Sequence, residues 1–303
     1  MSESIPCADF GPVRVYFGDS AGKYPDGNQV VVRGRDSVAV FDTPRVANAI
    51  GPAFDDADLA ILGHVHEDHM AGLHRLRRAR VHVHEADVDA ARSWEGLARH
   101  YGYSQAVLEG MLPMLREKFF YVPRPDAMPY ADGARWDLGG GVSVTAIHMP
   151  GHTAGHSVLL VEPGGIAFIG DIDLSSFGPY YGDATSSLAD FRRTIGRVPD
   201  VPARVWITSH HKGVVTERAE FLRLLRVFAA RVDEREARVL ELLGERPRTL
   251  AELAAARVVY KPEATDTWVD SAEARSIAQH LAELERDGRV ARDAADGAYH
   301  LRR

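Results

Sequence analysis

The sequence predicts an α/β protein of two parts, a larger domain over residues 1–232 and a small α+β domain over residues 233–303. Three observations support this. Short segments rich in Val, Ile and Phe alternate with helical patterns along the first part. Polar, histidine-rich clusters directly follow several of those segments. From about Asp233 the pattern changes to three helices and a hairpin.

The first half of the larger domain alternates strands with turns and helices. Turn residues separate the strands that we expect at Val13–Phe17, Gln29–Arg33, Val38–Asp42, Leu59–Leu62 and Val81–His84. A helical pattern runs from His69 to Arg78. Apolar residues at helical spacing predict an insertion of two or three helices over about 86–120, and a proline-rich loop follows at Val122–Gly133.

The second half repeats this alternation. We expect strands at Val142–His148, Ser157–Glu162, Ile166–Ile169 and Arg204–Thr208. A glycine- and tyrosine-containing loop is expected at Phe177–Asp183, and helices at Leu188–Ile195 and Glu217–Arg231.

The C-terminal residues predict a winged-helix-like domain. Helices are expected at Glu234–Leu243, at 250–256 after the cap Thr249, and at Ser271–Asp287, and a hairpin turns at Asp296-Gly297. From Arg231 to Arg303 there are 13 Lys and Arg against 15 Asp and Glu. Because phosphates would be repelled by such a domain, we expect a structural or dimer-forming role, with a homo-oligomer as one outcome, rather than DNA binding.

Composition excludes several classes of protein. The 303 residues are 45% hydrophobic and 26% charged, which is ordinary globular usage. The net charge of −7 does not attract phosphate backbones, so we do not expect a nucleic-acid partner. One cysteine, Cys7, excludes an intrachain disulfide framework and thiolate zinc clusters. Without a basic N-terminal segment or a long apolar run, we expect a cytoplasmic protein with no membrane partner.

The strongest functional signal is His64-Val65-His66-Glu67-Asp68-His69, directly after a predicted strand. Alternate residues of an extended segment point to the same side, so His64 and His66 can share one metal ion. Asp68 and His69 lie where the chain turns, and can serve a second ion. Imidazole and carboxylate suit zinc, and also iron or manganese. The alternative, a polar loop capped by Asp68, is disfavoured because four candidate ligands fall within six residues.

Three weaker clusters follow other strand ends. They are the segment Pro150–His156 with His152 and His156, the pair Gly170-Asp171, and the run Ser209-His210-His211. Each one alone is more typical of a turn or of a structural histidine. Together they share one property, because every candidate ligand lies just past the carboxyl end of a strand.

The order His-x-His-x-Asp-His, Gly-His-Thr, Gly-Asp and a late strand-end His resembles the metallo-β-lactamase superfamily over about residues 10–215. The resemblance implies an αββα sandwich, with the site at one edge of its two sheets. It also implies a ligand set: His64, His66 and His152 for the first metal, Asp68, His69 and His210 for the second, and Asp171 bridging them.

Three further sets of residues near the predicted ligands are alternative ligands or supports. The family more often has Gly-His-Gly at the last turn, which aligns His210 with the ligand and His211 with the second glycine. His156 matches a family position that usually supports the ligands without binding metal. Asp42 either hydrogen-bonds the free nitrogen of a ligand histidine or is a strand-end turn residue.

The implied chemistry is hydrolysis by two ions, most simply zinc. Ions about 3.5–4 Å apart hold a bridging hydroxide near neutral pH, which attacks an ester, thioester or lactone carbonyl. Asp68 or a water molecule is a candidate for protonating the leaving group. Tyr180 or Tyr181 is a candidate for binding the carbonyl oxygen, as tyrosines near this site do in related lactonases. Four apolar residues of the insertion form either a lid or packed core: Met111, Met114, Phe119 and Phe120.

Three other functions stay open. A nuclease fits the C-terminal pattern but not the charge. The superfamily permits a mononuclear iron dioxygenase, although Asp68, His69 and His210 argue for two filled sites. A transcription regulator with a vestigial core conflicts with the intact ligand set. We therefore expect an enzyme, a metal-dependent hydrolase with a small-molecule acyl substrate.

Overall fold

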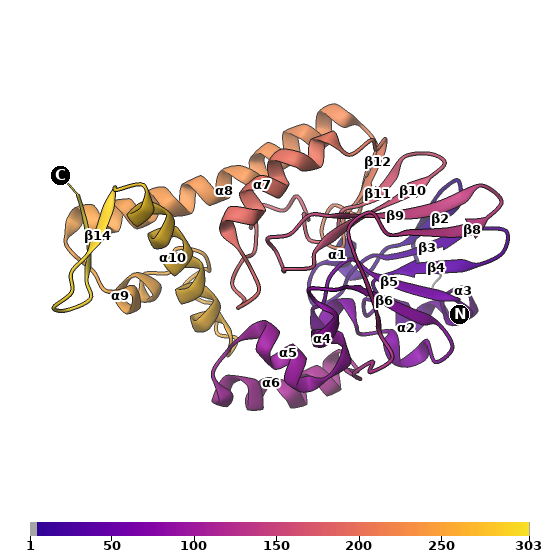
Figure 1. The fold of residues 1–303 in the computed structure, drawn as a ribbon, viewed down its shortest axis with the longest axis horizontal. Coiled ribbons are helices and arrows are strands. Elements are labelled where there is room, and N and C mark those ends of the chain that lie inside the picture. The colour runs from indigo at the N-terminus through magenta and orange to yellow at the C-terminus, as the bar shows by residue number, and fades with distance from the viewer. Residues whose placement is uncertain (1–4, 303) are drawn as a thin grey trace.

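A computed structural model describes residues 5–302 and contains two mixed β-sheets with helices outside them (Figure 1). The first sheet has seven strands in chain order: β1 (Cys7–Phe10), β2 (Val13–Tyr16), β3 (Gln29–Arg33), β4 (Val38–Phe41), β5 (Leu59–Leu62), β6 (Arg80–His84) and β7 (Met128–Tyr130). Neighbours are antiparallel from β1 to β4 and parallel from β4 to β7.

The second sheet has six strands in the order β13-β12-β11-β10-β9-β8. Its strands are β8 (Arg135–Gly139), β9 (Val142–His148), β10 (Ser157–Glu162), β11 (Ile166–Phe168), β12 (Val205–Ile207) and β13 (Val214–Val215). All neighbours are antiparallel except β11 and β12, which are parallel.

The helices lie on the outer faces of the sheets and in the C-terminal part. They are α1 (Asp19–Gly22), α2 (Ala47–Ile50), α3 (Pro52–Asp55), α4 (Val88–Arg92), α5 (Trp94–Tyr101), α6 (Gln105–Lys118), α7 (Leu188–Arg197), α8 (Arg218–Glu245), α9 (Leu250–Ala255) and α10 (Val269–Arg286). A hairpin, β14 (Val290–Arg292) with β15 (Tyr299–Leu301), ends the chain. No helix among the described residues has both the length and the apolar composition needed to cross a bilayer.

Three apolar cores stack the layers in the order helices, sheet, sheet, helices. The middle core joins the two sheets, where the rings of Phe41 and Phe168 lie 5.9 Å apart. A second core packs α4 to α6 against the first sheet, and a third packs α7 and α8 against the second. Burial of these strand faces on both sides explains why β5 and β11 are uniformly apolar. The α/β fold with mixed sheets is thus confirmed.

The helix predicted from His69 to Arg78 is absent. Two short 3₁₀ turns, η1 (Glu67–His69) and η2 (Leu73–Arg75), replace it. Two backbone hydrogen bonds join this segment to Thr43. The Thr43 N–H donates to the His69 carbonyl (2.8 Å), and the Thr43 carbonyl accepts from the Gly72 N–H (2.7 Å). Contacts with a distant turn thereby take the place of the i→i+4 ladder. The sequence interpretation also missed β1, β7, β8 and β13.

The two helices predicted on either side of Asp233 are one helix, the 28-residue α8. Its buried face continues without a break through Phe228, Val232, Arg235 and Val239, at helical spacing. No glycine or proline interrupts it there. The predicted division at 232/233 therefore falls inside a continuous helix, which runs from the second sheet to the C-terminal helices (Figure 1).

The C-terminal helices pack against the loop between β11 and α7. Arg235 donates to the carbonyls of Phe177 (2.6 Å) and Pro179, and the Tyr181 hydroxyl lies 2.8 Å from His280 Nε2. Gln279 donates to the Tyr181 carbonyl (2.8 Å). Because these partners are mostly backbone carbonyls, they fix the loop directly.

His280 makes the stability of this contact sensitive to acid. It is fully buried; burial first, and then the charges of Arg192 and Arg235, lower its pKa to about 3. Below pH 6.5 the His280 side chain is protonated in the unfolded chain but stays neutral in the folded chain. The part of the free energy of unfolding that His280 contributes above pH 6.5 is therefore lost as the pH falls toward 3.

We therefore expect His280→Gln to reduce the loss of unfolding free energy between pH 7 and pH 5 by about 2 kcal/mol. Urea unfolding at the two pH values measures this. His300→Gln, on the half-buried hairpin, is the matched control. Equal pH sensitivity in the wild type and His280→Gln would remove His280 as the cause.

Candidate metal centre

The predicted ligands come together at one edge of the two sheets. The first cluster follows β5, in the first sheet, and the others follow β9, β11 and β12 in the second sheet. Hydrogen bonds join the sheets beside the site. The Ser157 N–H donates to the Gly63 carbonyl (2.8 Å), and Asn28 Nδ2 donates to the Thr208 carbonyl (3.2 Å). The strand ends are therefore held in fixed relation.

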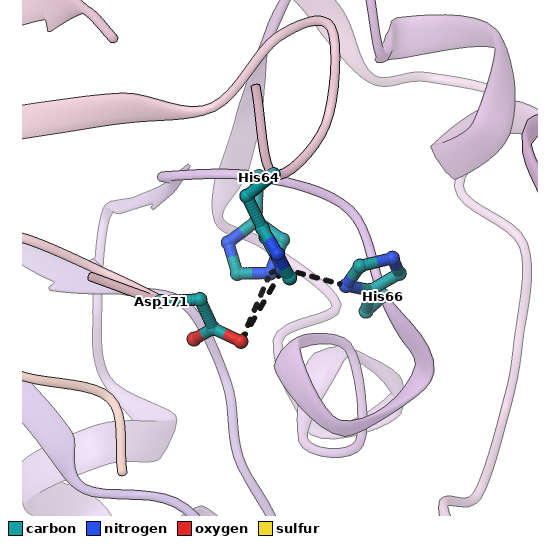
Figure 2. Close-up of side chains that lie close together, drawn as sticks. His64, His66 and Asp171 are labelled. Carbon is teal, nitrogen blue, oxygen red and sulfur yellow. Dashed lines mark hydrogen bonds and ion pairs between the residues drawn. The ribbon is translucent and has the colours of Figure 1, made fainter. Parts of the chain in front are cut away.

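The first group of donors consists of His64, His66, His152 and Asp171. Figure 2 labels three of them, His64, His66 and Asp171. His152 Nε2 lies 3.2 Å from His64 Nε2, 3.1 Å from His66 Nδ1 and 3.3 Å from Asp171 Oδ2. The three histidines are buried. Four donor atoms thus converge on one point.

The second group consists of Asp68, His69 and His210, again buried. His210 Nε2 lies 3.1 Å from Asp68 Oδ2 and 3.4 Å from His69 Nε2. Asp171 Oδ1 lies 3.4 Å from His69 Nε2 and 3.6 Å from His210 Nε2. Asp171 therefore turns one carboxylate oxygen to each group.

These spacings fit divalent metal ions. An ion with zinc–nitrogen bonds of about 2.0–2.1 Å in tetrahedral geometry separates its ligand atoms by about 3.3–3.4 Å, close to most of the distances above. Asp171 Oδ1 is buried and has no hydrogen-bond donor among the described residues. A buried carboxylate oxygen left in this way is suited to binding a cation. The donor set and its spacing agree with the metal sites that the sequence predicts.

The outer nitrogen of most ligand histidines is also held, as is usual for imidazole ligands. His69 Nδ1 lies 2.8 Å from Asp42 Oδ2, and His66 Nε2 lies 2.7 Å from Asp183 Oδ2. His152 Nδ1 lies 3.0 Å from the carbonyl of Tyr180. The hydrogen bond considered for Asp42 is thus present. These contacts orient each ring with one nitrogen toward the donor groups.

His156 and His210 have separate supports. His156 Nε2 accepts the Asp171 N–H (3.2 Å), and its Nδ1 contacts the Met149 carbonyl (3.0 Å). His156 therefore supports the turn that carries Asp171. His210 Nδ1 contacts the Gly22 carbonyl (2.8 Å).

The electrostatic field favours the unprotonated form of three candidate ligands, His64, Asp68 and Asp171. Against the cost of burial, neighbouring carboxylates raise the pKa of His66 and His210 to about 9 and that of His69 well above its usual value. Burial, and then the charge of His69, lower the pKa of His64 well below its usual value. Burial opposes ionisation of Asp171, but His69, His210 and His64 outweigh it and hold the pKa of that carboxyl well below its usual range. Against the same cost of burial, His69 and His210 also lower the pKa of Asp68. This field favours the carboxylate form of Asp68, whereas a general acid needs the protonated form. The role of Asp68 as an acid stays a prediction.

A cavity of about 400 Å³ opens over the two donor groups. Tyr180 lines it, and its hydroxyl donates to Asp183 Oδ1 (3.0 Å). Tyr181 is 1% exposed and lies in the core against His280. Tyr181 therefore does not face the site, contrary to one of the two expectations. The role of Tyr180 in binding the carbonyl oxygen stays a prediction.

Of the helical insertion, one apolar residue considered for a lid reaches the cavity and the others do not. Met111 lines the cavity, whereas Phe119 is buried in the core beside the first sheet. Met114 packs against that core, and Phe120 is exposed. Only Met111, of the four apolar residues considered for a lid, lines the site.

Two buried carboxylates at the cavity were missed in the sequence. Asp183 accepts from Tyr103 (2.6 Å) and contacts His66. Glu67 accepts from Tyr24 (3.0 Å) and Tyr101 (2.5 Å). Burial, and then the charge of Asp68, raise the pKa of Glu67. The partners are far apart in the chain, so no local spacing indicates these contacts.

The family follows from comparison with known proteins. Residues 25–230 match the Metallo-beta-lactamase superfamily, so the chain belongs to that superfamily, whose members are generally metal-dependent hydrolases. A curated relative, "Beta-lactamase-like protein 2 homolog" of Drosophila melanogaster, is 28% identical over 152 residues. The match covers 50% of this chain and 48% of the relative, so the chain spans about half the length of that protein.

Two solved structures cover nearly the whole chain. A metallo-beta-lactamase family protein from Thermus thermophilus is 25% identical, with a TM-score of 0.67, covering 91% of this chain and 94% of the other. A beta-lactamase domain protein from Burkholderia ambifaria is 18% identical, with a TM-score of 0.69, covering 99% and 97%. At 18% identity, the second match shows a shared fold alone.

Proposed function

We propose that the protein is a binuclear metal-dependent hydrolase of small-molecule esters, thioesters or lactones, with two zinc ions as its natural cofactor. The observation that carries this proposal is the position of Asp171. Its two oxygens face two separate donor groups, 3.3 Å from His152 Nε2 and 3.4 Å from His69 Nε2. A carboxylate placed in this way is suited to bridging two ions.

The two ions would be held by separate sets of residues. His64, His66 and His152 would hold one ion, and Asp68, His69 and His210 the other. Ions bound there would lower the pKa of a water molecule and polarise the substrate carbonyl. Asp42 and Asp183 fix the rings of His69 and His66. The walls of the cavity would orient the acyl group and exclude bulk water.

The charge of the cavity disfavours nucleic acid as substrate. Outside the donor groups, its charged lining comprises Lys23 and four carboxylates: Glu67, Asp173, Asp183 and Asp266. A phosphodiester chain needs a basic path to the metals, which these residues do not provide. This supports an acyl substrate over RNA.

For the C-terminal residues we propose a winged-helix-like domain without a DNA-binding role. The end of α8, helices α9 and α10, and the β14–β15 hairpin follow the order typical of that fold. Leu253, Ile277 and Leu281 lie in a separate small core. Gln279 and His280 of α10 contact the loop beside the site, so this part of the helix is already packed against the larger domain.

A substrate panel tests the proposed reaction. Purified zinc-loaded protein is assayed with esters, thioesters, lactones, β-lactams, a phosphodiester and RNA. We expect turnover of at least one acyl class, and no RNA cleavage above the level of a variant that lacks His64 and His66. Cleavage of RNA without turnover of any acyl substrate would identify a nuclease instead.

A further inference from the structure

The C-terminal segment forms one wall of the catalytic cavity. Tyr260, Trp268 and Val269 line it together with Tyr103 and Tyr180 of the larger domain. Trp268 and Tyr260 are half-buried, so part of each side chain faces the cavity. The space over the donor groups is therefore closed by residues far apart in the sequence.

Buried polar contacts hold this wall in place. Glu273, fully buried on α10, accepts hydrogen bonds from the backbone N–H groups of Val258 (2.7 Å), Val259 (3.0 Å) and Tyr260 (2.9 Å). A carboxylate with three backbone donors is satisfied without solvent. The segment that begins at Tyr260 is thus anchored to α10.

Arg275 of the same helix fixes α10 against the other walls. Its guanidinium donates to the carbonyls of Tyr101 (2.8 Å), Gly102 (2.7 Å) and Gly182 (3.1 Å). Tyr101 and Gly102 end α5, and Gly182 lies beside Tyr180. Arg275 therefore joins the wall to two other walls of the cavity by hydrogen bonds.

The chemistry of the wall is aromatic. The ring of Tyr260 lies 5.6 Å from that of Phe177, and Trp268 packs against the same apolar core as Trp94. The lining charges outside the donor groups, Lys23 with Glu67, Asp173, Asp183 and Asp266, are mainly negative. Aromatic faces bind apolar groups well, and nearby carboxylates repel anions.

We propose that residues 260–269 are the specificity-determining wall, and that they take the uncharged apolar or aromatic part of an acyl substrate. This inference rests on the proposed hydrolase function. Trp268 and Tyr260 would set the preference for acyl chain length, since a cavity of about 400 Å³ accommodates a small organic molecule.

The test compares 4-nitrophenyl acetate with 4-nitrophenyl octanoate. We expect Trp268→Ala to lower the ratio of the two kcat/KM values, octanoate over acetate, by about tenfold, the effect of losing a few methylene contacts. Trp94→Ala is the matched control, because Trp94 packs on the same core but does not line the cavity. It should leave the ratio unchanged.

A binding measurement separates this inference from the proposed reaction. Calorimetric titration with octanamide, a neutral probe, should show affinity about tenfold weaker in Trp268→Ala than in Trp94→Ala. If the wild type hydrolyses no ester but this difference in affinity appears, the inference about the wall is supported and the proposed reaction is wrong. If the ester ratio and the octanamide affinity are both unchanged, the wall is refuted. Tyr260→Leu replaces Trp268→Ala in both measurements if the latter does not fold.

Discussion

Asp171→Ala is expected to abolish both metal binding and hydrolysis. Among residues 5–302, Asp171 is the one carboxylate placed within 4 Å of His64, His152, His69 and His210, so its loss affects both donor groups. We expect kcat/KM to fall by more than about 100-fold, the upper range for losing even a residue that only supports a ligand. Steady-state assays with the best acyl substrate measure this.

Thermal stability provides a second measurement on the same variant. Zinc at about 100 times its Kd stabilises a folded protein by about 2.7 kcal/mol. The wild type should therefore gain stability with added zinc, and Asp171→Ala should not. Asp200→Ala, at an exposed aspartate outside the cavity, is the control. Full activity and an undiminished zinc response in Asp171→Ala would contradict the shared site.

The second large effect concerns His210 and His211. His210 is buried, 3.1 Å from Asp68 and 3.4 Å from His69. His211 is half-buried, and its nearest carboxylate is that of Asp173, 3.8 Å away. We expect His210→Ala to lose the second ion and to lower kcat/KM by more than about 100-fold, while His211→Ala changes it by less than about tenfold. Metal content and kinetics of the two variants, prepared in parallel, measure the difference.

The backbone of this turn supports the same ranking. His211 has φ +59°, a left-handed conformation that favours glycine. This agrees with aligning His211 with the second glycine of the family turn. His211→Gly is therefore the conservative control, which should retain metal and fold. Loss of the second ion in His211→Ala and its retention in His210→Ala would shift the ligand by one residue.

The positions of the candidate ligands could be predicted because they follow a local rule. His64, His152, Asp171 and His210 each lie just past a strand, and strand ends meet at a sheet edge whatever the loops do. The strands themselves, such as β5 and β10, are runs of buried apolar residues that composition identifies. These parts of the fold and site depend little on long-range detail.

The remaining features depend on contacts that no local pattern contains. The 3₁₀ turns after His66 form because Thr43, distant in sequence, bonds to this segment. Asp183 contacts His66 across 117 residues of sequence, and Trp268 lines the cavity because α10 packs against the larger domain. Tyr181 faces His280 for the same reason. Neighbouring tyrosines in a loop cannot be told apart until their partners are known.

Metal analysis of the purified protein by mass spectrometry tests the central claim most directly. Two donor groups share Asp171, so we expect close to two divalent ions per chain, with zinc predominant after expression in zinc-supplemented medium. The Asp171→Ala variant, prepared alongside, should hold far less of both. One iron per chain in the wild type, with no second ion under saturating zinc, would contradict a binuclear hydrolase and favour mononuclear iron chemistry.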